Sequence, residues 1–368
     1  MIEKIKSKLT SYRKILAKAL FDKKTGSAEK LNPAGAKNIL FLRTDGKIGD
    51  MVVSTLVFRE LKKCYPGIGI TVLCTKDNKE IIKRNVYVDD IILLSGKFFN
   101  DLKVFKSLKN KKIDIAVDFT QFRPRPKQLF MIRSINPGFL IGFNKSGYKT
   151  YDLSINCDVN KLHISKRYEL LLNALGVIPL SFKYDVFTEP DQEKAALETF
   201  KKGKNNILIN PFAASRHRTF SLSKLQDLLN RINGNFINKE EVNVFVICPK
   251  RFSSMLKGLY GAKIITTDSV LESAAYVKFC DCVITPDTSI VHIAAAFNKK
   301  MLALYLDDSH GEEKKSTIWD PNYDNAFKLT VPADAGLKNN DIKNIDNKDI
   351  EDMFRRIMGV TDKNAERN

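Results

Sequence analysis

The sequence predicts an α/β fold with two doubly wound halves, each built around a parallel sheet. Two observations carry this prediction: short β-branched runs alternate with helical periods, and this alternation occurs twice along 368 residues. Strands that alternate with helices form parallel sheets with helices on both faces. A chain of this length, 43% of it hydrophobic, can fill two separate cores. We therefore expect two Rossmann-like halves that meet near residues 177–190.

Ten short apolar runs are expected to form the strands. In the first half they are NILFL, ITVLC, DIILL, DIAVDF and FLIGF, with helices between them at 51–64, 77–84, 101–109 and 124–134. A helix at 165–175 leads to the second half, whose strands are NILIN, VNVFVIC, KIITT, CVITP and MLALYL. Ligands of such folds bind outside the carboxyl ends of the strands. The polar motifs of this chain follow strand ends, so we expect them to converge on one cleft.

Residues 1–24 have the pattern of a basic amphipathic helix. Apolar residues recur every three or four positions, and between them stand Lys4, Lys6, Lys8, Arg13, Lys14 and Lys18. Such a helix can lie in the interface of an anionic membrane, or it can pack on its own protein. We favour the membrane. Residues 25–36, TGSAEKLNPAGA, are expected to form a flexible linker.

Composition excludes several classes of protein. The chain contains no apolar run of about 18 residues and no signal-peptide pattern at its start, so a cytoplasmic location is expected. Its six cysteines lack the paired spacing of a zinc site and the density of a disulfide framework. Cys280 and Cys282 alone are too few ligands for a metal. We therefore expect reduced cysteines that pack in the core.

The net charge of +19 is concentrated in the first half of the chain. Residues 1–36 carry +6, residues 37–189 carry +11 and residues 190–368 carry +2. Such asymmetry can serve solubility alone, but it favours an anionic partner for the first half. Nucleic acid, a membrane surface and an acidic glycan are the candidates.

The loop RTDGKIGD, Arg43–Asp50, joins the first predicted strand to the first helix. Gly46 and Gly49 permit a tight turn or the close approach of another molecule, but they do not complete a GxGxxG fingerprint. Asp50 stands where a helix begins, and carboxylates are favoured there because they meet the positive end of the helix dipole. From its position alone, a capping role is favoured for Asp50.

Two motifs of the second half have anion-binding potential. In TPDTSIVHIAAAF, Asp287 or Thr288 can cap a helix whose exposed N–H groups, with Ser289, would hold a phosphate. His292 lies one turn beyond Thr288 on the same face. The alternative is a capped core helix with a hydrogen-bonded histidine.

The second of these motifs is NPFAASRHRTF, which follows the first strand of the second half. It places Arg216, His217 and Arg218 before a helix that begins near Ser221. Arginine forks suit a leaving diphosphate. A solvated loop explains this stretch equally well.

In their order and spacing, these motifs resemble glycosyltransferase family 9, the heptosyltransferases that build the inner core of lipopolysaccharide. The resemblance runs from about residue 38 to residue 321. It rests on R43-x4-I48-G49-D50, on the strand-N-P-x-A loop, on D287-T288-S289-x-x-H292-x-A-A-A followed by MLALY, and on Trp319-Asp320-Pro321.

The resemblance implies a GT-B fold and a division of the chain into four parts. These are the N-terminal helix and linker (1–36), an acceptor domain (37–185), a nucleotide-sugar domain (186–345) and a C-terminal helix and tail (346–368). It implies an inverting transferase that moves heptose from ADP-heptose to an anionic, lipid-linked core glycan. In this interpretation Asp50 is the general base that takes the proton of the acceptor hydroxyl.

The resemblance also assigns the binding residues. The donor diphosphate would be held by Arg216, Arg218, Asp287, Thr288, Ser289 and His292. The acceptor would meet Gly49 and the basic stretch FTQFRPRPKQLFMIR, in particular Arg123, Arg125 and Lys127. An exposed amphipathic helix that begins near Pro124 is the alternative for this stretch. The protein would work at the inner face of the inner membrane, which it would touch through residues 1–24.

Three departures from the family pattern bear on the donor sugar more than on the fold. Pro211-Phe212 stands for Pro-Gly, Arg218-Thr219-Phe220 for a Lys-Arg-aromatic run, and Asp287-Thr288-Ser289 for Asp-Thr-Gly. The chain also lacks an Asp-x-Asp metal motif, so we expect no metal or other cofactor. Arg218 and a helix N-terminus would then neutralise the leaving group.

Two alternatives remain open. The first is a GT-B transferase or sugar-nucleotide epimerase that uses another nucleotide sugar. An epimerase needs no acceptor, so product analysis separates the two enzymes. The second is a non-enzymatic nucleic-acid-binding protein, suggested by the isoelectric point of about 9.5. The chain shows no RNA- or DNA-binding motif, and we expect no nucleic-acid partner.

Overall fold

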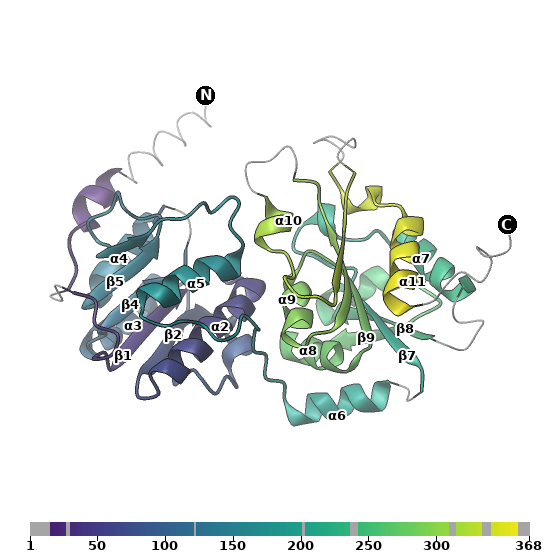
Figure 1. Ribbon diagram of the computed structural model, residues 1–368, viewed down its shortest axis with the longest axis horizontal. Coiled ribbons are helices and arrows are strands. Elements are labelled where there is room, and N and C mark those ends of the chain that lie inside the picture. The colour runs from purple at the N-terminus through teal and green to yellow at the C-terminus, as the bar shows by residue number, and fades with distance from the viewer. Residues whose placement is uncertain are drawn as a thin grey trace. The chain divides into compact units, whose positions relative to one another are not determined.

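The computed structural model describes residues 15–26, 30–120, 123–200, 203–235, 242–308, 314–332 and 340–359. The chain divides into two compact units after Phe182. The N-terminal unit covers residues 1–182 and the C-terminal unit covers residues 183–368. Each unit is described by itself (Figure 1). The sequence placed this boundary after residue 185.

The N-terminal unit contains a parallel sheet of six strands in the order β3-β2-β1-β4-β5-β6. The strands are β1 (Asn38–Arg43), β2 (Gly69–Thr75), β3 (Asp90–Leu94), β4 (Ile115–Asp118), β5 (Phe139–Phe143) and β6 (Leu153–Ile155). The helical elements are α2 (Ile48–Cys64), η1 (Lys79–Ile82), α3 (Phe98–Asn110), α4 (Pro126–Ile135) and α5 (Ile164–Ala174). Helix α3 packs beside α4, and α2 packs beside α5.

The C-terminal unit repeats this topology. Its parallel sheet has the order β12-β11-β10-β7-β8-β9, so its fourth strand again lies beside its first. The strands are β7 (Asn205–Ile209), β8 (Val242–Pro249), β9 (Lys263–Thr267), β10 (Cys282–Pro286), β11 (Lys300–Tyr305) and β12 (Ala326–Thr330).

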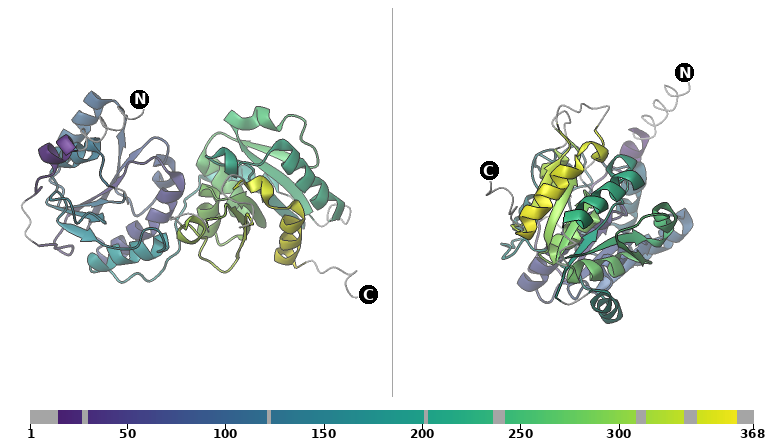
Figure 2. Two further views of the ribbon diagram at one scale, coloured as in Figure 1. Left: turned by 90° about the horizontal axis from the view of Figure 1, so that it is seen from above. Right: turned by 90° about the vertical axis from the view of Figure 1, so that its right-hand side faces the viewer.

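Six helices and three short 3-10 turns complete the C-terminal unit among the described residues. The helices are α6 (Pro190–Thr199), α7 (Leu222–Asn235), α8 (Val270–Phe279), α9 (Ser289–Ala296), α10 (Lys315–Ile318) and α11 (Asn347–Met358). The turns are η2 (Arg216–Arg218), η4 (Lys250–Leu256) and η7 (Ile342–Asn344). Helix α11 packs on α7, and α6 packs on α8 (Figure 2).

The central strands are almost entirely buried. Every residue of β4, β5 and β10 is buried, whereas the edge strand β12 is largely exposed. Central strands that are covered by helices on both faces have continuous apolar sequences. The ten predicted strands therefore all exist. Three elements were not predicted from the sequence: β6, β12 and α6. Strand β6 has only three residues, and β12 has exposed residues at three of its five positions, so neither forms a continuous apolar run. Helix α6 begins with the polar run PDQEK.

Two predicted helices differ from the structure in detail. The stretch 77–84 forms only the 3-10 turn η1, and α4 begins at Pro126 instead of near Pro124. Proline suits the first turn of a helix because its missing N–H has no partner there.

The described end of the N-terminal segment packs on the N-terminal unit. Residues 15–21 are helical, and the ring of Phe21 lies 5.4 Å from that of Phe130. Asp22 accepts hydrogen bonds from the N–H and the hydroxyl of Thr150 at 2.9 and 2.8 Å. Thr25, expected in the linker, is buried and bonds the carbonyl of Thr150. Residues 1–14 lie outside the described residues. No helix of the described part is long and apolar enough to span a membrane.

A buried carboxylate fixes the start of α3. Asp101 accepts hydrogen bonds from the N–H and hydroxyl of Ser95 at 2.8 and 3.0 Å, and from Nζ of Lys127 at 3.2 Å. Burial alone would raise the pKa of Asp101, but the bonds from Ser95 and Lys127 lower it below that of an ordinary aspartate. Asp101 thus ties α3 both to the end of β3 and to α4.

We expect Asp101→Asn to lower the unfolding free energy of the N-terminal unit at pH 7 by about 1–3 kcal/mol, because bonds to a buried charge are lost. The pKa of Asp101 is lower in the folded state, so its contribution is present above about pH 4 and disappears as the pH falls through the folded-state pKa. Hydrogen exchange of N-terminal peptides at several pH values measures this. The exposed Asp324→Asn is the control. A pH-independent difference would contradict the expectation.

Candidate functional site

The polar motifs of each unit lie at the point where the strand order reverses. In the N-terminal unit this point is between β1 and β4, and in the C-terminal unit it is between β7 and β10. Helices diverge to opposite faces of the sheet there, and the carboxyl ends of the two strands leave a crevice for ligands. Arg43–Asp50 follows β1, and Asp287 follows β10.

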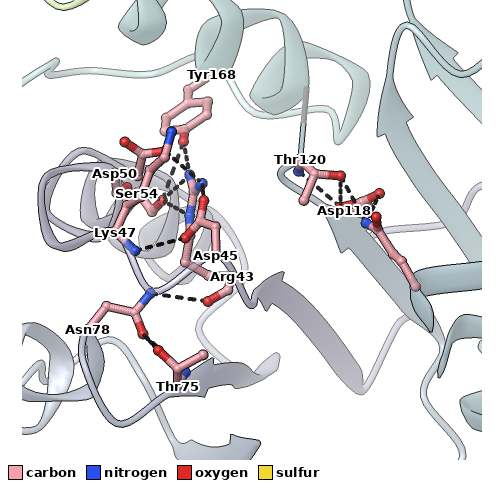
Figure 3. Close-up of polar contacts among 11 residues, drawn as sticks. Arg43, Asp45, Lys47, Asp50, Ser54, Thr75, Asn78, Asp118, Thr120 and Tyr168 are labelled. Atoms are coloured by element: carbon pink, nitrogen blue, oxygen red, sulfur yellow. Dashed lines mark hydrogen bonds and ion pairs between the residues drawn. The ribbon is translucent and has the colours of Figure 1, made fainter. Parts of the chain in front are cut away.

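Arg43, at the end of β1, carries the buried cation of the N-terminal site (Figure 3). Its side chain is 3% exposed, and Nη1 lies 3.0 Å from Oδ2 of Asp45 and 3.4 Å from Oδ2 of Asp50. Asp50 is the third residue of α2, and its side chain is 15% exposed. Nζ of Lys47 lies 3.8 Å from the same carboxylate oxygen. The loop therefore holds a carboxylate between cations at the edge of the sheet.

The far side of the guanidinium is fixed by neutral groups. Nε and Nη2 of Arg43 donate to Oγ of Ser54 at 3.2 and 2.9 Å, and Nη2 also donates to the hydroxyl of Tyr168. The ring of Phe119 lies 4.6 Å from the guanidinium carbon. Because partners surround the cation, Arg43 has one arrangement, and it presents Nη1 to the two aspartates.

The electrostatics of this loop favour a proton-accepting carboxylate. Burial raises the pKa of Asp50 above that of an ordinary aspartate; Arg43 and Lys47 oppose this shift, and Asp45 adds to it. A general base is most effective when its pKa approaches the working pH. A raised pKa at a strand end is typical of functional carboxylates.

The capping interpretation of Asp50 receives only partial support. Lys47 is the N-cap residue of α2, and its side chain makes no capping bond. The Asp50 carboxylate pairs with Arg43 and Lys47 and interacts with the side chain of Asp45. Its position in the first turn still suits the helix dipole. Ion pairs, and not a capping hydrogen bond to the helix backbone, therefore hold the side chain of Asp50.

A further buried carboxylate stands at the end of β4, apart from the Arg43 cluster, and the sequence predicted no role for it (Figure 3). Asp118 is buried and accepts from the N–H and hydroxyl of Thr120 at 2.9 and 2.8 Å, from Gln128 at 2.8 Å and from Tyr151 at 2.6 Å. Asp118 pairs in register with Leu42, next to Arg43. The only sequence signal was an aspartate at the end of a predicted strand.

The predicted acceptor residues lie around the same strand ends. Gly49 is the second residue of α2, and Arg123 and Arg125 are exposed just before α4. Lys127 is exposed but donates to Asp101, so its charge is partly neutralised. Gln121 and Phe122 of this stretch lie outside the described residues.

In the C-terminal unit, Arg218 and Asp287 form an ion pair across two loops. Nη1 of Arg218 donates to both the carbonyl and Oδ2 of Asp287 at 2.7 Å. Burial raises the pKa of Asp287, and Arg218 opposes this shift. Asn210, which follows β7, donates to the hydroxyls of Thr285 and Thr288 at 2.9 and 3.3 Å. Asn210 was part of a predicted motif but had no predicted role.

The motif after β10 begins α9 as the sequence predicts. The hydroxyl of Thr288 accepts from the N–H of Ile290 at 3.2 Å, and Ser289 is the first helical residue. His292 is buried one turn later, and its ring meets the edges of Tyr184 and Trp319 at 6.1 and 5.9 Å between centroids. The start of α9, Arg218 and Asn210 therefore meet at one strand edge.

The other basic residues of the RHR loop point elsewhere. The three residues form the turn η2, in which Arg216 and His217 are exposed. Nδ1 of His217 lies 3.2 Å from Oδ2 of Asp341. Only Arg218 of the three reaches the motif after β10.

The cysteines are free thiols, and four of the six are buried: Cys74, Cys248, Cys280 and Cys282. Burial raises the pKa of the Cys74 and Cys282 thiols to about 12. Within the described ranges, no group of three or more His, Cys, Asp or Glu side chains is arranged to hold a metal ion.

Two parallel six-stranded sheets, each with polar loops at its switch point, define the GT-B class of glycosyltransferases. The structure of glycosyl transferase family 9 from Veillonella parvula DSM 2008 has a TM-score of 0.73 and 14% identity, and covers 91% of this chain and 100% of its own. The structure of the E. coli ADP-heptose lps heptosyltransferase II has a TM-score of 0.68 and 14% identity, with 88% and 98% covered.

The sequence assigns the chain more closely. The model of glycosyltransferase family 9 (heptosyltransferase) matches residues 102–339, so the chain belongs to this family and is a glycosyltransferase. The Escherichia coli (strain K12) protein named "Putative lipopolysaccharide heptosyltransferase 4" is 25% identical over 337 residues, which are 90% of each protein. The predicted family, fold and enzyme class are confirmed. The family match begins after Asp50, so it does not test that residue.

We expect Asp50 to titrate above the ordinary aspartate value of about 3.9, because it is buried. Asp45→Asn should lower this pKa, since it removes the neighbouring negative charge. Carbon NMR of labelled aspartate carboxyls across the acid range measures both. Asp77→Asn, an exposed change in the next loop, is the matched control. A pKa at or below 3.9 for Asp50, or one that Asp45→Asn leaves in place, would rule out this electrostatic description.

Proposed function

We propose that this protein transfers heptose from ADP-heptose to an anionic, lipid-linked acceptor of the lipopolysaccharide core, with inversion at the anomeric carbon. Membership of the heptosyltransferase family supports the sugar. The names of two similar E. coli proteins support the acceptor class and the ADP donor. The observation that carries the mechanism is the carboxylate of Asp50, held by Arg43 at the switch point of the N-terminal unit.

In the proposed reaction, Asp50 accepts the proton of the acceptor hydroxyl while the oxygen attacks the anomeric carbon of the sugar. The bond from that carbon to the diphosphate breaks, and ADP leaves with the electron pair. Arg43 keeps the Asp50 carboxylate in place, and burial raises its pKa, which makes it a better proton acceptor than an ordinary aspartate. Each atom and proton is then accounted for without a redox step.

The leaving ADP would be stabilised by the C-terminal unit. The first N–H groups of α9, the hydroxyls of Thr288 and Ser289, and the guanidinium of Arg218 lie where a diphosphate would bind. Asp287 orients Arg218 through two bonds from Nη1. His292 would complete the nucleotide side, and Arg216 would approach from the exposed turn. We propose that this set acts without a metal ion.

The acceptor would meet the N-terminal unit. Its charge suits an anionic glycan, because residues 37–189 carry +11. Gly49 gives access to Asp50, and Arg123, Arg125 and Lys127 lie at the same strand edge. We propose accordingly that the enzyme works in the cytoplasm, peripheral on the inner face of the inner membrane, and that it has no nucleic-acid partner.

We expect Asp50→Asn to lower turnover at least about a hundredfold, because the amide cannot accept the proton near neutral pH. ADP affinity should be unchanged, since the nucleotide is assigned to the other unit. Single-turnover assays with excess EDTA test the base and the absence of a metal together. Asp352→Asn, an exposed change in α11, is the control. Near-normal turnover of Asp50→Asn would reject the base, and activity that requires added Mg²⁺ or Mn²⁺ would reject the metal-free scheme.

We expect ADP and ADP-heptose to raise the melting temperature more than UDP or GDP compounds, because a ligand of the native state stabilises it. Arg218→Gln should weaken ADP binding by about 1–3 kcal/mol through loss of a charged hydrogen bond. Calorimetry of this variant against the exposed Arg356→Gln measures the difference.

The same panel decides the alternative. The departures at Phe212 and Ser289 from the family pattern favour a second candidate, a GT-B transferase or epimerase that uses another nucleotide sugar. A UDP or GDP compound that shifts the melting temperature while ADP does not would replace the heptose proposal with this one. Product formation without an acceptor would identify an epimerase.

A further inference from the structure

A row of aromatic rings crosses three elements of the N-terminal unit and ends in solvent. Phe21 meets Phe130 of α4 at 5.4 Å between centroids, Phe130 stacks on Phe98 at 5.7 Å, and Phe98 meets Phe99 at 5.6 Å. Phe98 is 51% exposed and Phe99 is 78% exposed. The first two residues of α3, Phe98 and Phe99, are therefore exposed aromatic side chains, and Phe98 is held by its packing on Phe130.

The helix of residues 15–21, which packs on the same α4 through Phe21, carries further exposed apolar residues. Ala17 is buried and Phe21 packs on α4, so these two residues, one turn apart, face the protein. Leu16 and Leu20, also one turn apart, are 61% and 53% exposed. We call the exposed apolar residues of the two elements the apolar patch: Ile15, Leu16, Leu20, Phe98 and Phe99. Exposed apolar residues that cluster in this way mark an interaction surface.

The charge around the apolar patch has one sign. Residues 15–24, 97–110 and 123–135 contain eleven Lys and Arg, all exposed, whereas their two aspartates, Asp22 and Asp101, are buried. The cations are Lys18, Lys23, Lys24, Lys97, Lys103, Lys106, Lys109, Arg123, Arg125, Lys127 and Arg133. Lys103 and Lys106 follow Phe99 by four and seven residues, so they share its face of α3.

We propose that the apolar patch and the exposed cations of the same segments form a docking surface for an anionic phospholipid bilayer. Leucine and phenylalanine side chains with lysines beside them suit the boundary between acyl chains and head groups. Each lysine near such a surface adds electrostatic attraction. A second copy of this chain fits poorly, because a two-fold contact would bring this set of exposed cations against the same set of the other copy.

The position of the patch explains its use. Helix α3 follows the carboxyl end of β3, α4 follows that of β4, and Lys18 donates to the carbonyl of Gly147 in the loop after β5 at 2.8 Å. In a parallel sheet these strand ends lie at one edge. This is the edge that carries Asp50 after β1. A bilayer at this edge would bring lipid-linked molecules to the same side of the sheet as Asp50. The docking surface itself does not depend on the proposed sugar transfer.

The test uses the full-length protein and vesicles of phosphatidylcholine with or without phosphatidylglycerol, without nucleotide or acceptor. We expect co-sedimentation with the anionic vesicles that weakens with salt. The double variant Leu20→Ser/Phe99→Ser should lower the partition coefficient about tenfold or more, through loss of two apolar side chains. Tyr260→Ser is the matched control, because it removes a 62% exposed aromatic from the C-terminal unit. Hydrogen exchange of N-terminal peptides that matches that of the unaltered protein shows that the double variant is folded.

A gain of signal locates the contact. Phe99→Trp adds an indole at the most exposed ring of the row, and brominated phospholipids should quench its fluorescence while leaving Trp319 unaffected. Absence of quenching, or unchanged partitioning of the double variant, would overturn the proposal. If sedimentation equilibrium instead shows a dimer that Phe99→Ser dissociates, the patch is an interface between copies and the bilayer is excluded. Because no sugar transfer is measured, these outcomes are separate from those of the proposed reaction.

Discussion

The N-terminal site depends on one buried cation. A guanidinium that is 3% exposed is stable only when its charge is paired and its N–H groups are bonded. Arg43 meets this requirement with Asp45, Asp50, Ser54 and Tyr168. The same requirement positions Asp50, because its carboxylate is one of the partners that make burial of the cation possible. Stability and chemistry therefore draw on the same contacts.

The C-terminal unit uses an arginine in the opposite way. Arg218 is 27% exposed, and the buried partner is Asp287, whose side chain is 14% exposed. Asp287 accepts from a single nitrogen of Arg218, so among the described residues this pair engages only one corner of the guanidinium. The two carboxylates are covered alike, at 15% exposed for Asp50 and 14% for Asp287, so the two sites differ in their cation. Arg43 is enclosed, whereas Arg218 reaches the surface, which suits the binding of an anion by the C-terminal unit.

Much of this arrangement could be predicted, because its signals are local. Continuous apolar runs identified the buried strands, and the motifs at their ends located Asp50, Asp287 and Thr288. Contacts between residues that are far apart in the sequence could not be predicted. Tyr168 bonds an arginine 125 residues earlier in the chain, and Asp118 reaches Tyr151 across the sheet. Tyr168 and Asp118 do not belong to a recognisable motif. A tyrosine or an aspartate at these positions would also suit an ordinary protein core, so the sequence alone does not mark them as functional.

The apolar patch follows from the same geometry as the site. A parallel sheet sends every strand end to one edge, so loops that carry polar chemistry and helices that begin beside them share that edge. Asp101 connects the two helices that begin at this edge, because it accepts hydrogen bonds from Ser95, just before α3, and from Lys127 in α4. Asp101 is buried and paired with Lys127. The exposed charged residues of α3 and α4 are therefore all cations, and they accompany the exposed rings of Phe98 and Phe99. The proposed surface for phospholipids therefore lies at the same sheet edge as Asp50, the proposed base.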